Sequence, residues 1–134
     1  MDSVKQTILL IDDVEENRLI LKYRLEKEGF AVITASNGKE GLEKLEEESI
    51  CIIFLDINMP VMDGHTFLNK IKSDARYAKI PIVIITALDE TGAVIKTMRA
   101  GACGYLTKPF SMEQIRAQLD FCLRSGPPPD QHPS

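Results

Sequence analysis

The stretch Ile8-Leu9-Leu10-Ile11-Asp12-Asp13 decides the fold class, because an apolar run leads directly into two carboxylates. A short, uninterrupted apolar run rich in isoleucine is typical of a strand that is buried on both faces. Such strands occur in parallel sheets, whose crossover helices cover both faces. We therefore expect an α/β fold in which Asp12 and Asp13 follow the first strand.

Similar apolar runs recur along the chain, bounded by polar residues or glycine, at Ala31–Thr34, Ile50–Leu55, Ile82–Ile85 and Gly104–Leu106. The longer segments between them carry apolar residues at helical spacing, such as Leu21 and Leu25. A last helix begins after Ser111, a suitable N-cap residue. This alternation predicts a three-layer α/β sandwich, with a five-stranded parallel sheet and five helices.

The 134-residue length and ordinary composition, 44% hydrophobic and 27% charged, predict one globular domain. We place the domain at residues 1–124 and predict a disordered Pro-rich tail or linker at residues 125–134. The net charge of −4 argues against direct nucleic-acid binding, and no apolar run is long enough to span a membrane. The first residues lack the pattern of a signal peptide, so we expect a cytoplasmic protein.

The cysteines are expected to be buried small hydrophobic residues. Cys51, Cys103 and Cys122 are odd in number, widely spaced and set among apolar residues. This pattern indicates neither a disulfide framework nor a metal-ligand cluster.

Polar residues end the predicted strands: Asp12 and Asp13 the first, Asp56 the third and Thr86 the fourth, while Lys108 follows the fifth. Ligands of open parallel sheets bind beyond the carboxyl ends of the strands, so these residues should converge on one rim. Taken singly, each is also an ordinary cap or loop residue. The set, rather than any one member, indicates a functional site.

Three carboxylates on one rim favour a bound cation. Each pair of like charges about 5 Å apart costs about 3 kcal/mol at an effective dielectric constant near ~20. Oxygen ligands without nearby histidine or cysteine favour Mg²⁺ over zinc. With Lys108 as a mobile positive charge and Thr86 as a hydroxyl donor, the set suits phosphoryl transfer to a carboxylate, with Asp56 as the nucleophile.

The chain resembles the response-regulator receiver family of two-component signalling over roughly residues 6–124. The motifs that carry the resemblance are Leu9-Leu10-Ile11-Asp12-Asp13, Leu55-Asp56-Ile57-Asn58-Met59-Pro60 with Met62-Asp63-Gly64, Ile85-Thr86-Ala87, and Tyr105-Leu106-Thr107-Lys108-Pro109-Phe110. The resemblance implies a flavodoxin-like, doubly wound sheet with strand order 2-1-3-4-5. The alternation of apolar runs alone does not determine that order.

The resemblance also implies a role for each site residue. Asp56 would be the phosphoacceptor, and the Mg²⁺ ligands would be Asp12, Asp13, Asp56 and the backbone carbonyl of Asn58. The remaining implied roles are phosphate binding by Thr86, Ala87 and Lys108, conformational switching by Thr86 and Tyr105, and a cis peptide bond between Lys108 and Pro109.

The family further implies the partners. A sensor histidine kinase or a histidine phosphotransfer protein would donate the phosphoryl group, and a small phosphodonor would do so slowly. The output face would be built from the fourth helix, fifth strand and fifth helix, and would contact a downstream effector protein or domain. The protein would catalyse only its own phosphorylation and dephosphorylation, so it is not expected to be an enzyme with a separate substrate. Homodimerisation on phosphorylation stays open.

Two other functions compete with this prediction. An aspartate-nucleophile phosphohydrolase usually has its nucleophile on the first strand and another acid two residues later. Here Asp56 ends the third strand and Asn58 stands two residues on. A receiver-shaped binding module that takes no phosphate is disfavoured because the acidic residues, Thr86 and Lys108 are all present.

Methionine, aromatic and other apolar residues at helical spacing give only a weak indication of a partner surface. Val94, Met98, Met112 and Phe121 could form an apolar surface for a partner, but such residues more often lie in the core. We expect core positions for them.

Overall fold

The computed structural model describes residues 6–57, 64–86 and 91–125. Strands and helices alternate throughout, as the apolar pattern predicts. The strands are β1 (Thr7–Ile11), β2 (Ala31–Ala35), β3 (Ile52–Asp56), β4 (Ile82–Thr86) and β5 (Gly104–Thr107). The helices are α1 (Glu15–Lys27), α2 (Gly38–Glu47), α3 (Gly64–Lys72), α4 (Thr91–Arg99) and α5 (Met112–Ser125).

The strands form one parallel sheet in the order β2-β1-β3-β4-β5, which confirms the expected order. The register sets Ile11 of β1 opposite Leu55 of β3. Asp56 lies opposite Ile85 of β4, and Thr86 lies opposite Thr107 of β5. The carboxyl ends of β1, β3, β4 and β5 therefore lie at the same edge of the sheet.

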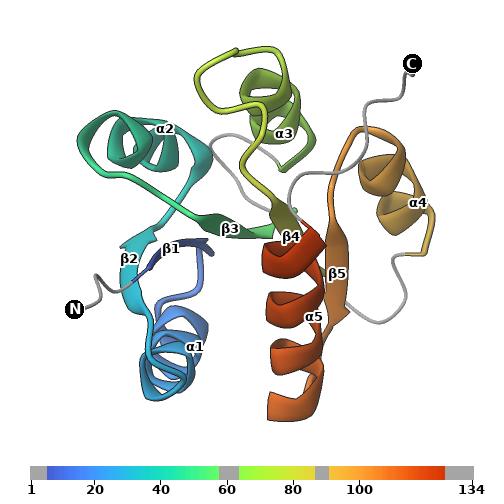
Figure 1. Cartoon of the computed structure of the whole chain (residues 1–134). Coiled ribbons are helices and arrows are strands. Elements are labelled where there is room, and N and C mark those ends of the chain that lie inside the picture. The colour runs from blue at the N-terminus through green and yellow to red at the C-terminus, as the bar shows by residue number, and fades with distance from the viewer. Residues whose placement is uncertain (1–5, 58–63, 87–90, 126–134) are drawn as a thin grey trace.

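Helices cover both faces of the sheet, which makes the predicted three-layer sandwich (Figure 1). All residues of β3 and β4 are buried, as expected for central strands of a parallel sheet. On one face, Leu21 and Leu25 of α1 and Ile115 of α5 pack with inward residues of the strands. On the other face, α2 and α3 supply residues such as Phe67. The predicted Leu21 and Leu25 stripe is confirmed.

Side chains cap two of the helices. Asn37 accepts a hydrogen bond from the Glu40 backbone N–H at the start of α2 (2.8 Å). At the start of α5, the Ser111 hydroxyl accepts from the Gln114 backbone N–H (3.2 Å), and the Gln114 side chain accepts from the Ser111 backbone N–H (2.8 Å). This reciprocal capping confirms Ser111 as the N-cap predicted from the sequence.

The prediction that the cysteines form no disulfide was wrong for one pair. Cys103 and Cys122 form a disulfide that joins the residue before β5 to α5, whereas Cys51 is free. Their separation of 19 residues hid the pairing, because only the packing of α5 on β5 brings them together. The sequence also predicted that all three cysteines are buried. Cys122 is fully buried, as predicted, whereas Cys103 and Cys51 are only half-buried.

Exposed apolar side chains gather on two surfaces. One lies on α1 and includes Leu19, Ile20 and Tyr23. The other belongs to three neighbouring elements, and we call it the α4–β5–α5 face, defined by the exposed side chains Ile95, Met98, Tyr105 and Phe121. The expectation of core positions was therefore wrong for Met98 and Phe121, whereas Met112 packs against the core. Among the described residues, no helix combines the length and the apolar character needed to cross a membrane.

Candidate functional site

The predicted site lies where β1, β3 and β4 end. Asp12 follows β1, Asp56 is the last residue of β3 and Thr86 is the last residue of β4. Backbone hydrogen bonds extend the sheet ladder past these points: the Asp12 N–H donates to the Ala35 carbonyl (3.2 Å), and the Lys108 N–H donates to the Thr86 carbonyl (2.9 Å). The sheet itself therefore fixes the backbone of the site residues.

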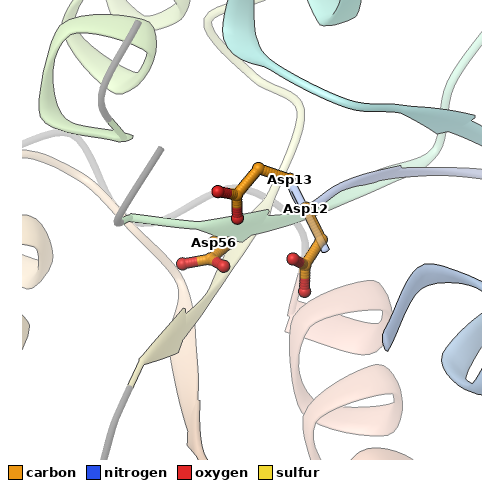
Figure 2. Close-up of side chains that lie close together, drawn as sticks. All are labelled: Asp12, Asp13 and Asp56. Carbon is orange, nitrogen blue, oxygen red and sulfur yellow. The ribbon is translucent and has the colours of Figure 1, made fainter. Parts of the chain in front are cut away.

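The carboxylates of Asp12, Asp13 and Asp56 form a cluster, with one oxygen from each residue lying within 4.8 Å of the others. Figure 2 shows Asp12 and Asp13, at the end of β1, beside Asp56 at the end of β3. Asp12 and Asp56 are buried, with 2% and 4% of their surface exposed, whereas Asp13 is exposed. The cluster thus has two buried carboxylates and one that faces solvent, an arrangement that leaves a path for an ion to enter.

Lys108 supplies positive charge to this cluster. Its Nζ lies 3.5 Å from Asp56 Oδ2 and 3.9 Å from Asp12 Oδ2. A single ammonium cannot balance three carboxylates, so a divalent cation would neutralise the remaining charge. The donor set consists of carboxylate oxygens, which Mg²⁺ prefers, and Asp13 keeps the site open to the water molecules that Mg²⁺ retains. The residues present therefore fit a magnesium ion.

Asp12 also has a structural role. Its Oδ1 accepts a hydrogen bond from the Val14 backbone N–H (2.9 Å), and its carbonyl accepts one from Arg18 Nη1 (2.6 Å). These bonds hold the turn from β1 into α1, while Oδ2 faces Lys108. Val14, rather than either aspartate, is the N-cap residue of α1 and has no side-chain cap. Asp12 therefore has both of the roles that the sequence allows. Its Oδ1 stabilises the turn, as in an ordinary loop residue, and its Oδ2 faces Lys108 within the carboxylate cluster.

The remaining predicted residues differ in their exposure to solvent. Thr86 is buried at the end of β4, with 1% of its surface exposed. Tyr105 is 44% exposed and belongs to the α4–β5–α5 face. The Lys108–Pro109 peptide bond, expected to be cis, is cis. The predictions for Asn58 and Ala87 fall outside the described residues.

A cleft of about 470 Å³ opens beside Asp12 and Lys108, between α1 and the connection from β5 to α5. Its lining combines apolar side chains such as Ile20 and Phe110 with the guanidinium-bearing Arg24. This cleft was not predicted from the sequence. The available signal was Leu19 and Ile20, apolar residues of α1 that lie off the buried Leu21 and Leu25 stripe.

Comparisons with known proteins agree on one family. The sequence model of one family, the response regulator receiver domain, matches residues 8–120 of this chain. The alkaline phosphatase synthesis transcriptional regulatory protein PhoP of Bacillus subtilis is 36% identical over 121 residues, which cover 90% of this chain and 50% of that relative. This chain thus spans about half the length of the curated relatives it matches.

Solved structures give the same result. A response regulator receiver domain protein from Clostridium thermocellum is 30% identical, with a TM-score of 0.83 over 90% of this chain and 95% of that chain. The receiver domain of a sensor histidine kinase from Pseudomonas aeruginosa is 26% identical, with a TM-score of 0.80 over 87% of this chain and 96% of that chain. That structure has a magnesium ion coordinated in its active site cleft.

Proposed function

The chain belongs to the response regulator receiver family of two-component signalling, and we propose that it accepts a phosphoryl group on Asp56. The observation that carries this proposal is the carboxylate cluster, with its oxygens within 4.8 Å of one another and Lys108 Nζ 3.5 Å from Asp56. A buried carboxylate beside an ammonium group is arranged to receive an anionic group whose charge must be balanced. Of the two buried carboxylates, Asp56 lies nearer to Lys108, which supports the choice of Asp56 as the acceptor.

In this proposal the ligands that would hold Mg²⁺ are Asp12, Asp13, Asp56 and the backbone carbonyl of Asn58. The ion, when bound, would supply positive charge to the phosphoryl oxygens. Lys108 pairs with one phosphoryl oxygen, and the Thr86 hydroxyl and the Ala87 backbone bind others. The magnesium ion in the related Pseudomonas aeruginosa receiver structure supports the choice of metal.

The proposed transfer starts from a phosphohistidine. An Asp56 carboxylate oxygen attacks phosphorus, the new P–O bond forms and the P–N bond breaks, and the imidazole leaves with its electron pair and takes up a proton. Lys108 is positioned to stabilise the negative charge on the transferring group. The protein promotes its own phosphorylation and dephosphorylation and has no separate substrate. The donor is a sensor histidine kinase or a histidine phosphotransfer protein.

The cleft between α1 and the β5–α5 connection suits contact with that donor. A phosphohistidine that reaches Asp56 must bring its carrier protein against the rim of the site, where the cleft opens beside Asp12 and Lys108. Ile20 and Phe110 offer apolar surface, and Arg24 offers charge. We place the reaction in the cytoplasm, because phosphohistidine is formed there from ATP.

The proposed output is a change in the α4–β5–α5 face. Phosphoryl oxygens on Asp56 favour a state in which Thr86 moves inward and Tyr105 follows. This movement alters the surface of Ile95, Met98 and Phe121 that a downstream effector protein or domain, or a second copy of the chain, would contact. The receiver itself comprises residues 1–124, with residues 125–134 as a tail or linker, and binds neither nucleic acid nor membrane directly.

The test is phosphorylation by phosphoimidazole, a small analogue of phosphohistidine, in the presence of Mg²⁺, followed by intact-mass measurement. Wild type should gain one phosphoryl group, and Asp56→Asn should gain none. The matched control is Asp120→Asn, which removes an exposed carboxylate on α5 and should be phosphorylated like wild type. Equal phosphorylation of Asp56→Asn and wild type would refute the assignment of the acceptor.

A further inference from the structure

We propose that Cys103 and Cys122 are a reversible redox modification site, oxidised by low-molecular-weight disulfides such as glutathione disulfide, that fastens α5 to β5. The two residues form a disulfide with their Cα atoms 6.0 Å apart. Disulfides in the reducing cytoplasm are usually transient or sensing rather than structural. A cytoplasmic receiver with such a pair would therefore change its cross-linking with the thiol redox state.

The packing of α5 on β5 positions the pair. The Cys103 backbone N–H donates to the Ile82 carbonyl at the start of β4 (2.8 Å), which fixes Cys103 beside the sheet. At the neighbouring Gly104, a Cβ would collide with the side-chain oxygen of Gln118 and would lie 3.6 Å from Cys122 Sγ. Glycine at this position leaves room for the Gln118 side chain, and Cys122 of the same helix lies at an ordinary contact distance beside it.

Burial determines the order of the reaction. Cys103 is half-buried, whereas Cys122 is fully buried, with none of its surface exposed. A dissolved disulfide can therefore reach Cys103 first, and Cys122 completes the reaction from within the core. Cys51 provides an internal comparison, because burial raises its thiol pKa to about 11 and keeps it protonated and unreactive near neutral pH.

The chemistry balances with glutathione disulfide as the oxidant. The Cys103 thiolate attacks one sulfur of glutathione disulfide, the glutathione S–S bond breaks, and one glutathione leaves as a thiol with the proton that Cys103 lost. This step leaves the Cys103 sulfur bonded to the other glutathione as a mixed disulfide. The Cys122 thiolate then attacks the Cys103 sulfur, the Cys103–Cys122 bond forms, and the second glutathione leaves as a thiol with the proton that Cys122 lost. Two cysteine thiols lose two electrons in total, and one glutathione disulfide is reduced to two thiols.

The cross-link bears on the proposed output, so this consequence rests on the proposed function. Phe121 immediately precedes Cys122, and Tyr105 lies two residues after Cys103; both side chains are exposed on the α4–β5–α5 face. The disulfide ties α5 to the residue before β5, close in sequence to both side chains, and so restrains the face on which Tyr105 changes position. The oxidised protein should therefore respond less to phosphorylation than the reduced protein.

The experiment incubates the full chain with glutathione disulfide and then with dithiothreitol, and maps the cysteines by alkylation and mass spectrometry. Wild type should form the Cys103–Cys122 disulfide and lose it on reduction, while Cys51 stays free. Cys122→Ser should hold one glutathione on Cys103, whereas Cys103→Ser should hold none on Cys122. Cys51→Ser is the matched control and should behave like wild type. All these measurements are repeated in Asp56→Asn, where the cysteine chemistry should be unchanged.

The second readout is amide hydrogen exchange in α5 with and without beryllofluoride and Mg²⁺. Oxidation should slow exchange in α5 by at least about tenfold and reduce the change that beryllofluoride causes. The proposal is overturned if both thiols remain open to alkylation after oxidation, or if the disulfide resists reduction in the folded protein. A loss of the beryllofluoride response in both redox states, with normal disulfide formation, would instead count against the proposed function alone.

Discussion

At the scale of single residues, the site depends on the unequal surroundings of three aspartates. Asp12 and Asp56 are buried and lie near Lys108, whereas Asp13 is exposed. The buried pair is held in place by the sheet and by the ammonium group, and this arrangement keeps both carboxylates oriented without a metal. Asp13 is the member that solvent and an incoming ion reach directly.

Replacing Lys108 by glutamine removes the ammonium group that lies within 4.0 Å of both buried carboxylates. Because Lys108 is partly exposed, we expect the free energy of unfolding without Mg²⁺ to fall by only about 1–3 kcal/mol. The phosphorylation rate with acetyl phosphate should fall at least about tenfold, since the charge on the transferring group loses a partner. Urea unfolding in a chelator and intact-mass kinetics measure the two effects.

The control for this variant is Lys79→Gln, which removes an exposed lysine. It should leave the unfolding midpoint and the phosphorylation rate close to those of wild type. Equal behaviour of Lys108→Gln and Lys79→Gln would show that the ammonium group contributes little to either property.

At the scale of elements, the packing of α2 on β1 supports the strand that leads to Asp12. A Cβ at Gly41 of α2 would lie 2.5 Å from Ile11 Cδ1 and 3.2 Å from Phe67 Cε1, and both side chains are fully buried. Gly41→Val should therefore overpack the core and lower the free energy of unfolding by about 1–3 kcal/mol. Urea denaturation measures this change.

Gly92 offers a matched comparison, because a Cβ there would meet no heavy atom within 4 Å. Gly92→Val makes the same chemical change in α4 without crowding and should be neutral or stabilising by less than about 1 kcal/mol. If the two valine variants had the same stability, the close approach of α2 to β1 would not constrain the sequence.

The start of α2 should make stability depend on pH. Hydrogen bonds from the Ser36 backbone N–H and hydroxyl to Glu40 (2.6 and 2.8 Å) lower the pKa of this carboxyl group. A carboxyl whose pKa is lower in the folded state stabilises the protein above its unfolded pKa, and this contribution is lost as pH falls through the folded value. Glu40→Gln should therefore cost about 1 kcal/mol at pH 7.

The difference between Glu40→Gln and wild type should begin to shrink as pH falls below the unfolded pKa of a glutamate, about 4.3, and should be lost once pH is below the lower pKa of Glu40 in the folded state. Unfolding curves recorded at several pH values test this, with Glu43→Gln, an exposed residue of the same helix, as the control. A stability difference that stays constant from pH 7 to about pH 3 would exclude the carboxylate as its cause.

Elements were easier to predict from the sequence than the contacts between them. The apolar runs predicted the five strands, and the signal was strongest for β3 and β4, which are buried on both faces. The resemblance, rather than the runs, supplied the strand order. The Cys103–Cys122 disulfide and the cleft at Ile20 were missed, since both arise where separate elements meet. The disulfide leaves no local pattern, and the only local signal of the cleft is a pair of apolar residues, Leu19 and Ile20, outside the buried stripe of α1.

At the scale of the whole molecule, the candidate site exists only when the sheet is formed. Asp12 and Asp13 follow β1, Asp56 ends β3, and Lys108 follows β5, so distant parts of the chain supply the charges. In the unfolded chain Asp56 and Lys108 are far from the adjacent pair Asp12 and Asp13, so the complete cluster cannot bind one ion. Any ligand that requires the cluster therefore binds the folded state and stabilises it.

Mg²⁺ should for this reason raise the stability of the wild type, by about 2.7 kcal/mol at a concentration ~100 times its dissociation constant. Asp13→Asn should lose most of this effect because it removes a metal ligand from the cluster. Without metal the same variant should be as stable as wild type or slightly more stable, since a like charge is removed from the two buried carboxylates. Wild type should thus be the more stable of the two proteins with Mg²⁺, but not without it. Glu16→Gln, which removes an exposed acid from the first turn of α1, should follow wild type in both conditions. Thermal unfolding of the three proteins with MgCl₂ and with a chelator measures these stabilities. Equal Mg²⁺ stabilisation of wild type and Asp13→Asn would place the metal elsewhere.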